Sequence, residues 1–177
     1  MSKSIASVLL SVAFVSSGFS LKAQQSGDTS SAIKQFTRSG KFSGITLYFV
    51  HMNNRTVEAL FQAPTKYSMR ARANMATMLY VQGTPDKDVT LATDFVLEQD
   101  GQTMNGTPFN IKNFQAGAVP KGERIDGIVQ FEKKVDLSHP FTIKNGGDSI
   151  EFSLSPEALK LLEPPPQQAP PDAAGKK

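Results

Sequence analysis

"FTIKNGGDSIEF" (residues 141–152) is the stretch of sequence that decides the fold. Phe141 and Ile143 alternate with polar residues before Asn145–Gly146, and Ile150 and Phe152 alternate in the same way after it. Asn-Gly between two alternating apolar runs is among the strongest short-range signals for a β-hairpin. We therefore expect two antiparallel strands here, with Phe152 facing the core.

Residues that favour strands are concentrated in further segments along the chain: Ile45–Val50, Arg55–Ala63, Met78–Val81, Val89–Gln99 and Arg124–Lys134. About seven short strands separated by turns are typical of a β-sandwich. The predicted fold is therefore all-β, an immunoglobulin-like β-sandwich. Phe131 is expected to face its core together with Phe152.

Local signals predict how these segments are joined. Asp100–Gly101 and Asn105–Gly106 are both expected to form tight turns with positive φ. Residues 65–78 hold enough Ala, Arg and Met for a helix, but their apolar residues also alternate, which favours a strand. Ser155 and Pro156 fit the N-cap and first residue of a short C-terminal helix.

The first 23 residues have the three-part layout of a secretory signal peptide. Lys3 precedes an apolar run from Ile5 to Val15, and small residues lead to Ala23. The serines and Gly18 interrupt the run, which is too short for a stable spanning helix of about 20 apolar residues. We therefore predict cleavage after Ala23 and export to the periplasm or the extracellular space.

Composition divides the rest of the chain into one domain and two tails. Residues 24–39 are rich in Ser, Gly, Gln and Thr and are predicted to form a flexible leader. Residues 163–177 contain five prolines and are predicted to form a disordered Pro-rich tail. Between them, residues 40–162 have a normal size for a single β-sandwich domain.

Three motifs give the chain a resemblance to a known group of proteins. They are Asp100–Gly101, Gly106 with Asn110–Ile111, and Lys121–Gly122 with Gly127–Phe131. In this order they resemble uncharacterised exported bacterial immunoglobulin-like domains over roughly residues 78–155. The resemblance implies a sandwich fold with a non-catalytic accessory or binding role, and it transfers no site residue.

Residue types needed for catalysis are scarce. The chain has no cysteine, its two histidines are His51 and His139, and it contains no G-x-S-x-G motif. We therefore predict no enzymatic activity and no cofactor. Solvated strand edges account for the carboxylates of the central strands, Asp94, Glu98, Asp126 and Glu132.

A soft-metal site is the alternative function that the sequence leaves open. His51 and Met52 adjoin at the end of a strand, and Met69 and Met75 follow. Imidazole and thioether ligands suit Cu(I), so a copper carrier of the cell envelope would use this set. Adjacent strand residues point to opposite faces, however, which argues against His51 and Met52 binding one ion.

Charge is unevenly distributed along the chain. The net charge of +3 falls to about +1 once the signal peptide is removed, so binding to nucleic acid is not predicted. Between residues 31 and 80, seven bases accompany the single acid Glu58. Lys66, Arg70 and Arg72 could form one basic patch that binds an acidic protein or an anionic envelope polymer. Alternatively, these bases pair with acids from the other half of the domain.

The signal-peptide hypothesis predicts the first residue of the exported protein. Because the small-residue segment ends at Ala23, N-terminal sequencing of protein recovered outside the cytoplasm should begin at Gln24, within about three residues. A mature chain that still begins with Met1 would contradict the hypothesis.

Overall fold

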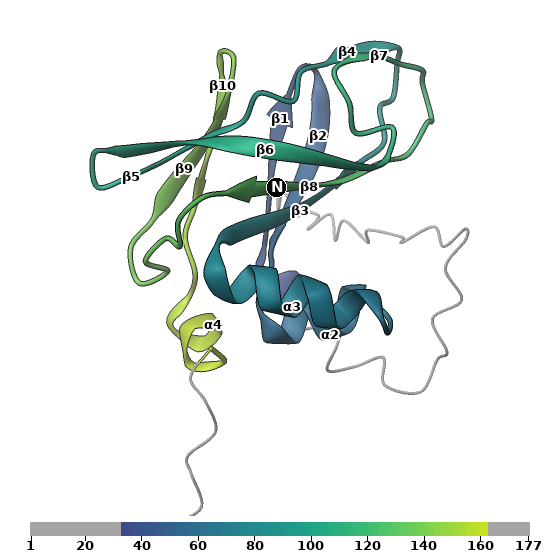
Figure 1. The fold of residues 1–177 in the computed structure, drawn as a ribbon. Coiled ribbons are helices and arrows are strands. Elements are labelled where there is room, and N and C mark those ends of the chain that lie inside the picture. Colours follow the sequence, from purple (N-terminus) through teal and green to yellow (C-terminus); the bar gives the residue numbers. More distant parts are fainter. Residues whose placement is uncertain (1–32, 163–177) are drawn as a thin grey trace, which may run out of the picture.

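The computed structural model describes residues 33–162, which fold mainly as antiparallel sheet (Figure 1). The all-β class predicted from the sequence is confirmed, and the described residues contain ten strands rather than about seven. The strands are β1 (Thr37–Phe42), β2 (Ile45–His51), β3 (Thr77–Gly83), β4 (Val89–Leu91), β5 (Val96–Gln99), β6 (Gln102–Lys112), β7 (Gly117–Val119), β8 (Ile125–Phe131), β9 (Phe141–Asn145) and β10 (Asp148–Phe152). Eight of them form one sheet in the order β1-β2-β3-β8-β6-β5-β9-β10, and β4 pairs with β7.

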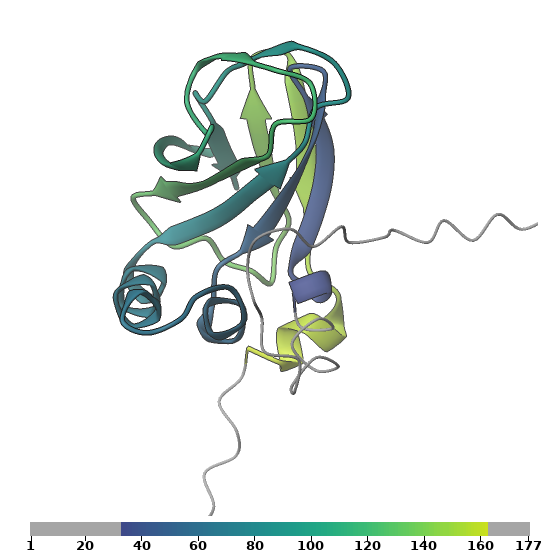
Figure 2. The same cartoon turned by 90° about the vertical axis from the view of Figure 1, so that its right-hand side faces the viewer.

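Two helices lie on the outer face of this sheet, α2 (Asn54–Leu60) and α3 (Thr65–Met75). Figure 2 shows them side by side below the strands. The strand predicted for Arg55–Ala63 is therefore wrong, and so is the strand favoured for residues 65–78. Asn53 explains the first error, because its side chain accepts hydrogen bonds from the amides of Arg55 and Thr56 in a capping box that starts the helix.

The second error has a different cause. The Ala, Arg and Met residues of α3 are strong helix formers. Met69 and Ala73, four residues apart, pack on the outer face of the sheet with Met78 and Tyr80. This helical spacing buries apolar surface that an alternating strand would have divided between two faces. Strand β3, which follows α3, begins only at Thr77.

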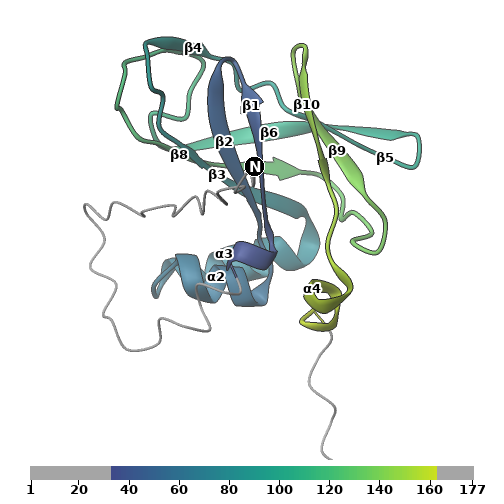
Figure 3. The same ribbon diagram turned by 180° about the vertical axis from the view of Figure 1, so that it is seen from behind.

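The sheet curves until its first and last strands lie beside each other, forming a seam between β1 and β10 (Figure 3). Contact is close, since a Cβ added to Gly40 would lie 1.9 Å from Cγ2 of Ile150. The amide of Ser43 donates to Oδ2 of Asp148 at 2.8 Å, and the Arg38 guanidinium donates to the carbonyl oxygen of Ser153. Side chains therefore close the seam at both ends.

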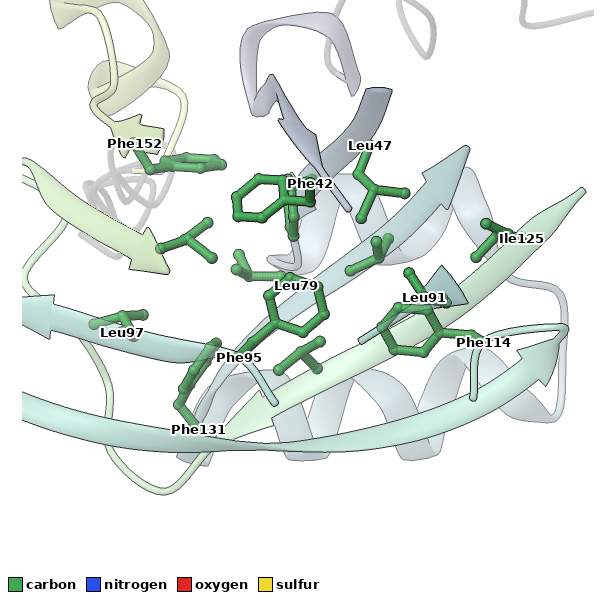
Figure 4. Packing of buried hydrophobic residues seen from close by; sticks show 14 of the residues in the cluster. Phe42, Leu47, Leu79, Leu91, Phe95, Leu97, Phe114, Ile125, Phe131 and Phe152 are labelled. Carbon is green, nitrogen blue, oxygen red and sulfur yellow. The ribbon is translucent and has the colours of Figure 1, made fainter. Parts of the chain in front are cut away.

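The space enclosed by the sheet is filled largely by phenylalanine (Figure 4). Phe42, Phe49 and Phe95 form a triangle of edge-to-face pairs with centroid separations of 5.2, 5.8 and 5.7 Å. Such pairs contribute about 0.5–1.5 kcal/mol each beyond their buried area. Phe131 and Phe152 are fully buried in the same core, which confirms their predicted orientation.

Three of the four predicted local signals are confirmed. Asn145–Gly146 turns the β9–β10 hairpin, and Asp100 and Gly101 adopt positive φ angles of 49° and 76° between β5 and β6. Ser155 caps α4 (Pro156–Lys160) by accepting a hydrogen bond from the amide of Ala158. The turn predicted at Asn105–Gly106 is wrong, because both residues lie inside β6.

The domain begins earlier than the sequence suggested. Strand β1 starts at Thr37, and residues 33–35 form a helical turn before it, so the predicted leader of residues 24–39 extends too far. The predicted signal peptide, the rest of that leader and the tail of residues 163–177 lie outside the described residues. Within residues 33–162, no helix has the length and apolar character needed to cross a membrane.

Tight packing inside the sheet makes Gly127 sensitive to a single added methyl group. Its Cβ would lie 2.0 Å from Cδ1 of the buried Phe114. We expect Gly127→Ala to lower the free energy of unfolding by about 1–3 kcal/mol, measured by chemical denaturation. Gly147→Ala is the matched control, since no atom lies within 4 Å of its Cβ position. Equal stabilities of the two variants would contradict the packing described.

Candidate functional site

Helices α2 and α3 cover only part of the outer sheet face. The register places Tyr48, Gln82 and Asp126 in one row across β2, β3 and β8. The next row contains Val50, Tyr80, Ile128 and Phe109, the last of these on β6. Side chains in both rows point away from the core, because alternate residues share a face. We call the part of this face beside α3, together with Arg72 of α3 that lies over it, the outer platform. It comprises Tyr48, Arg72, Tyr80, Phe109, Arg124 and Asp126.

A buried carboxylate lies at the centre of the outer platform. Asp126 is only 5% exposed. The hydroxyl of Tyr80 donates to its Oδ1 at 2.6 Å, and Arg124 binds both of its oxygens, with Nη2–Oδ1 at 2.9 Å and Nε–Oδ2 at 2.6 Å. A buried charge is tolerated when it is paired and hydrogen-bonded in this way. The solvated strand edge predicted for Asp126 is therefore wrong.

The same contacts shift the pKa values of Tyr80 and Arg124. Burial raises the pKa of Tyr80 well above its usual value, and the hydrogen bond to Asp126 raises it further. The hydrogen bond to Asp126 likewise raises the pKa of Arg124. Tyr80 consequently stays protonated as a donor and Arg124 stays charged. The two groups therefore orient the Asp126 side chain through lasting hydrogen bonds.

Arg72 and Phe109 form the exposed side of the outer platform. The Arg72 guanidinium carbon lies 5.9 Å from the centre of the Phe109 ring, within cation–π range. Phe109 is 39% exposed, and the neighbouring Ile111 is 51% exposed. Among residues 33–162, no carboxylate forms an ion pair with Arg72. A cation, an aromatic face and an aliphatic side chain are thus presented together to solvent.

The structure divides the three basic residues that the sequence grouped. Lys66 and Arg70, four positions apart on α3, both face α2 and bind the two carboxylate oxygens of Glu58 at 2.5 Å each. The hydrogen bond from Lys66 is the main cause of the lowered pKa of Glu58. Arg72 lies on the opposite flank of the helix, over β6. Only Arg72 therefore belongs to the outer platform.

The residues of the soft-metal alternative are not brought together. His51 lies on the inner face of β2 against Phe152. Met52 instead belongs to the outer cluster, the buried apolar residues between the outer sheet face and helices α2 and α3. Met69 is partly buried in that outer cluster, and Met75 is 71% exposed. In the described part of the chain, no three His, Cys, Asp or Glu side chains are arranged to hold a metal ion. The side chains expected to bind a soft metal thus do not converge on one position.

Sequence reasoning missed most of the outer platform. The sequence predicts Tyr80 only as a member of a strand and Arg124 only as the start of one. A signal was present at Asp126, which stands between Ile125 and Gly127 in an otherwise apolar segment. A carboxylate in a strand buried on both faces needs a partner, and Tyr and Arg are suitable donors.

Comparisons with known proteins give no family for this chain. No protein-family model matches it, and neither does any curated protein or solved structure. The resemblance to exported immunoglobulin-like domains therefore stays a prediction, and the function must be argued from the outer platform itself.

The hydrogen bond between Tyr80 and Asp126 can be tested by removing one oxygen atom. Tyr80→Phe leaves the buried carboxylate with Arg124 alone, so the free energy of unfolding should fall by about 1.5–3 kcal/mol. Tyr48→Phe on the same face is the matched control, because Tyr48 is 38% exposed and does not contact a buried carboxylate within residues 33–162, and its effect should stay within about 0.5 kcal/mol. Similar losses in both variants would show that the bond to Asp126 contributes nothing specific.

Proposed function

We propose that this protein is an exported, non-catalytic binding module that holds an acidic protein or an anionic envelope polymer on its outer platform. The observation that carries the proposal is the exposed pair of Arg72 and Phe109. Export is supported by the charge, apolar run and small residues of the first 23 positions. The absence of nucleophile and general-base motifs from the sequence supports a role without catalysis.

The Arg72–Phe109 pair suits an anionic partner for two reasons. A guanidinium can rest on an aromatic ring and still offer planar N–H donors to a carboxylate, sulfate or phosphate. Stacking on Phe109 also restricts the side chain, so less conformational entropy is lost on binding. Exposed aromatic and aliphatic groups beside it provide apolar contact area that a freely solvated arginine lacks.

Further groups around this pair favour the same partner. Lys112 is exposed on β6 and lies in register with Asp126, next to the bulge that contains Ile111. The charge of Asp126 is taken up by Arg124 and Tyr80, so it contributes little repulsion toward an anion. The outer platform therefore has a positive exposed side, although the mature chain as a whole is close to neutral.

Two arginines on the same helix provide a matched test. We expect Arg72→Gln to weaken binding of fluorescent poly-L-glutamate or alginate about fivefold, equivalent to about 1 kcal/mol, and to flatten its salt dependence. Arg70→Gln removes the same charge from α3, but Arg70 already faces Glu58, so its binding should stay close to that of the wild type. Fluorescence anisotropy at several salt concentrations measures both effects.

The role of the aromatic ring can be separated from that of the charge. Phe109→Leu keeps an apolar side chain but removes the π face, and it should weaken binding in the same direction as Arg72→Gln. Equal losses for Arg70→Gln and Arg72→Gln would indicate attraction by overall charge and would contradict a site on the outer platform. No binding of either probe by the wild type would overturn the proposed function for these partner classes.

A further inference from the structure

His51 is a buried titratable residue that the proposed binding function does not use. It is the last residue of β2, it is 5% exposed, and its side chain lies on the inner face of the sheet. Its ring centre is 6.4 Å from that of Phe152 on β10. Its Nδ1 atom is buried and has no hydrogen-bond partner within the described residues. Burial of the ring without a partner for Nδ1 favours its neutral form.

The main chain of His51 joins three elements. Its amide donates to the carbonyl of Phe36 at 2.9 Å, which ties β2 to the start of β1. Its carbonyl accepts from Oγ1 of Thr56 at 2.8 Å, and Thr56 belongs to the capping box of α2. A displacement of His51 would consequently be transmitted to β1 and to the beginning of α2.

Two cations lie near this end of the seam, and one of them, Lys134, acts on His51. Lys134, from the segment after β8, is close enough to disfavour a second positive charge. Arg38 of β1 lies over Phe152, the aromatic neighbour of His51, with its guanidinium carbon 5.6 Å from the centre of the Phe152 ring. It also donates to the carbonyl of Ser153. The groups contributed by β3, β10 and α2 are Leu79, Phe152 and Thr56, none of which carries a charge. No acid in these contacts could stabilise an imidazolium.

We propose that His51 is an acid-operated latch for the seam between β1 and β10. In its neutral form the ring packs against Phe152 and the seam closes through Arg38 and Ser153. A proton on the ring places a second positive charge near Lys134 at a buried position, which is unfavourable. The ring must then move toward solvent, which separates Phe152 from its neighbours and opens this end of the seam.

The pH range follows from the titration of the same group. Burial, with a smaller contribution from Lys134, lowers the pKa of His51 from 6.5 to about 4. A lowered histidine pKa means that the unfolded or opened chain takes up the proton first. The stability associated with the neutral ring is therefore complete above pH 6.5, is lost progressively as the pH falls, and is gone below about pH 4. Acidification, not alkalinisation, opens the latch.

The first test compares stability at pH 7.5 and pH 4.5 in the wild type, in His51→Met and in His139→Asn. The linkage relation predicts that the wild-type folding equilibrium constant falls about 70-fold more than that of His51→Met over this range. His139 is exposed, so His139→Asn should behave like the wild type. A His51→Met protein with the same acid sensitivity as the wild type would overturn the proposal, because other groups would then account for the loss.

The second test uses the wild type alone and stays decisive if His51→Met does not fold. Hydrogen exchange, corrected for the intrinsic effect of pH, should show loss of protection in β1, in β10 and at the start of α2 at pH 4.5. Protection of β4 and β7, which pair with each other and not with β1 or β10, should fall less. Unchanged protection of the seam, or a His51 ring resonance that titrates near pH 6.5, would contradict the latch.

Discussion

The close approach at Gly106 is the constraint on which the rest of the structure depends. Strand β6 pairs with β5 up to Asn105 and with β8 from Gly106 onward, so one strand belongs to both halves of the sheet. At the change of partner, the amide of Gly106 donates to the carbonyl of Phe95 at 2.7 Å. A Cβ here would lie 2.4 Å from Cγ1 of Val129. Only glycine lets the two halves join at the angle that encloses the phenylalanine core.

The inner and outer faces of the closed sheet differ in composition and in exposure to solvent. The inner face holds the apolar core and leaves His51 as an unpaired titratable group at one end. The outer face is longer than the two helices that cover it, and its uncovered part keeps exposed aromatic surface. Asp126 lies on the outer face next to buried apolar residues, and its pairing with Arg124 and Tyr80 offsets part of the desolvation penalty of the buried carboxylate.

Tertiary contacts place the basic residues on the two sides of α3 in different environments. Glu58, the single acid in the basic half of the chain, is used by Lys66 and Arg70, whose charges are therefore partly neutralised. Arg72 is turned by the helix toward an aromatic ring instead of a carboxylate. Three residues that look equivalent in the sequence thus have different environments, and one of them retains the geometry for binding an anion.

Local chemistry in the sequence determined the all-β class, the hairpin at Asn145–Gly146, the turn at Asp100–Gly101 and the cap at Ser155, because each depends on residues close together in the chain. Phe131 and Phe152 were predictable for the same reason, since strand alternation is a local pattern. Tertiary structure decided where the helices of residues 54–60 and 65–75 lie, because their apolar residues pack against Met78, Tyr80 and Ile128 of the outer sheet face. It also decided that Gly106 permits a close approach rather than a turn, and that Tyr80, Arg124 and Asp126 meet. Those contacts join residues up to 46 positions apart, and no local pattern specifies which distant strand will become a neighbour.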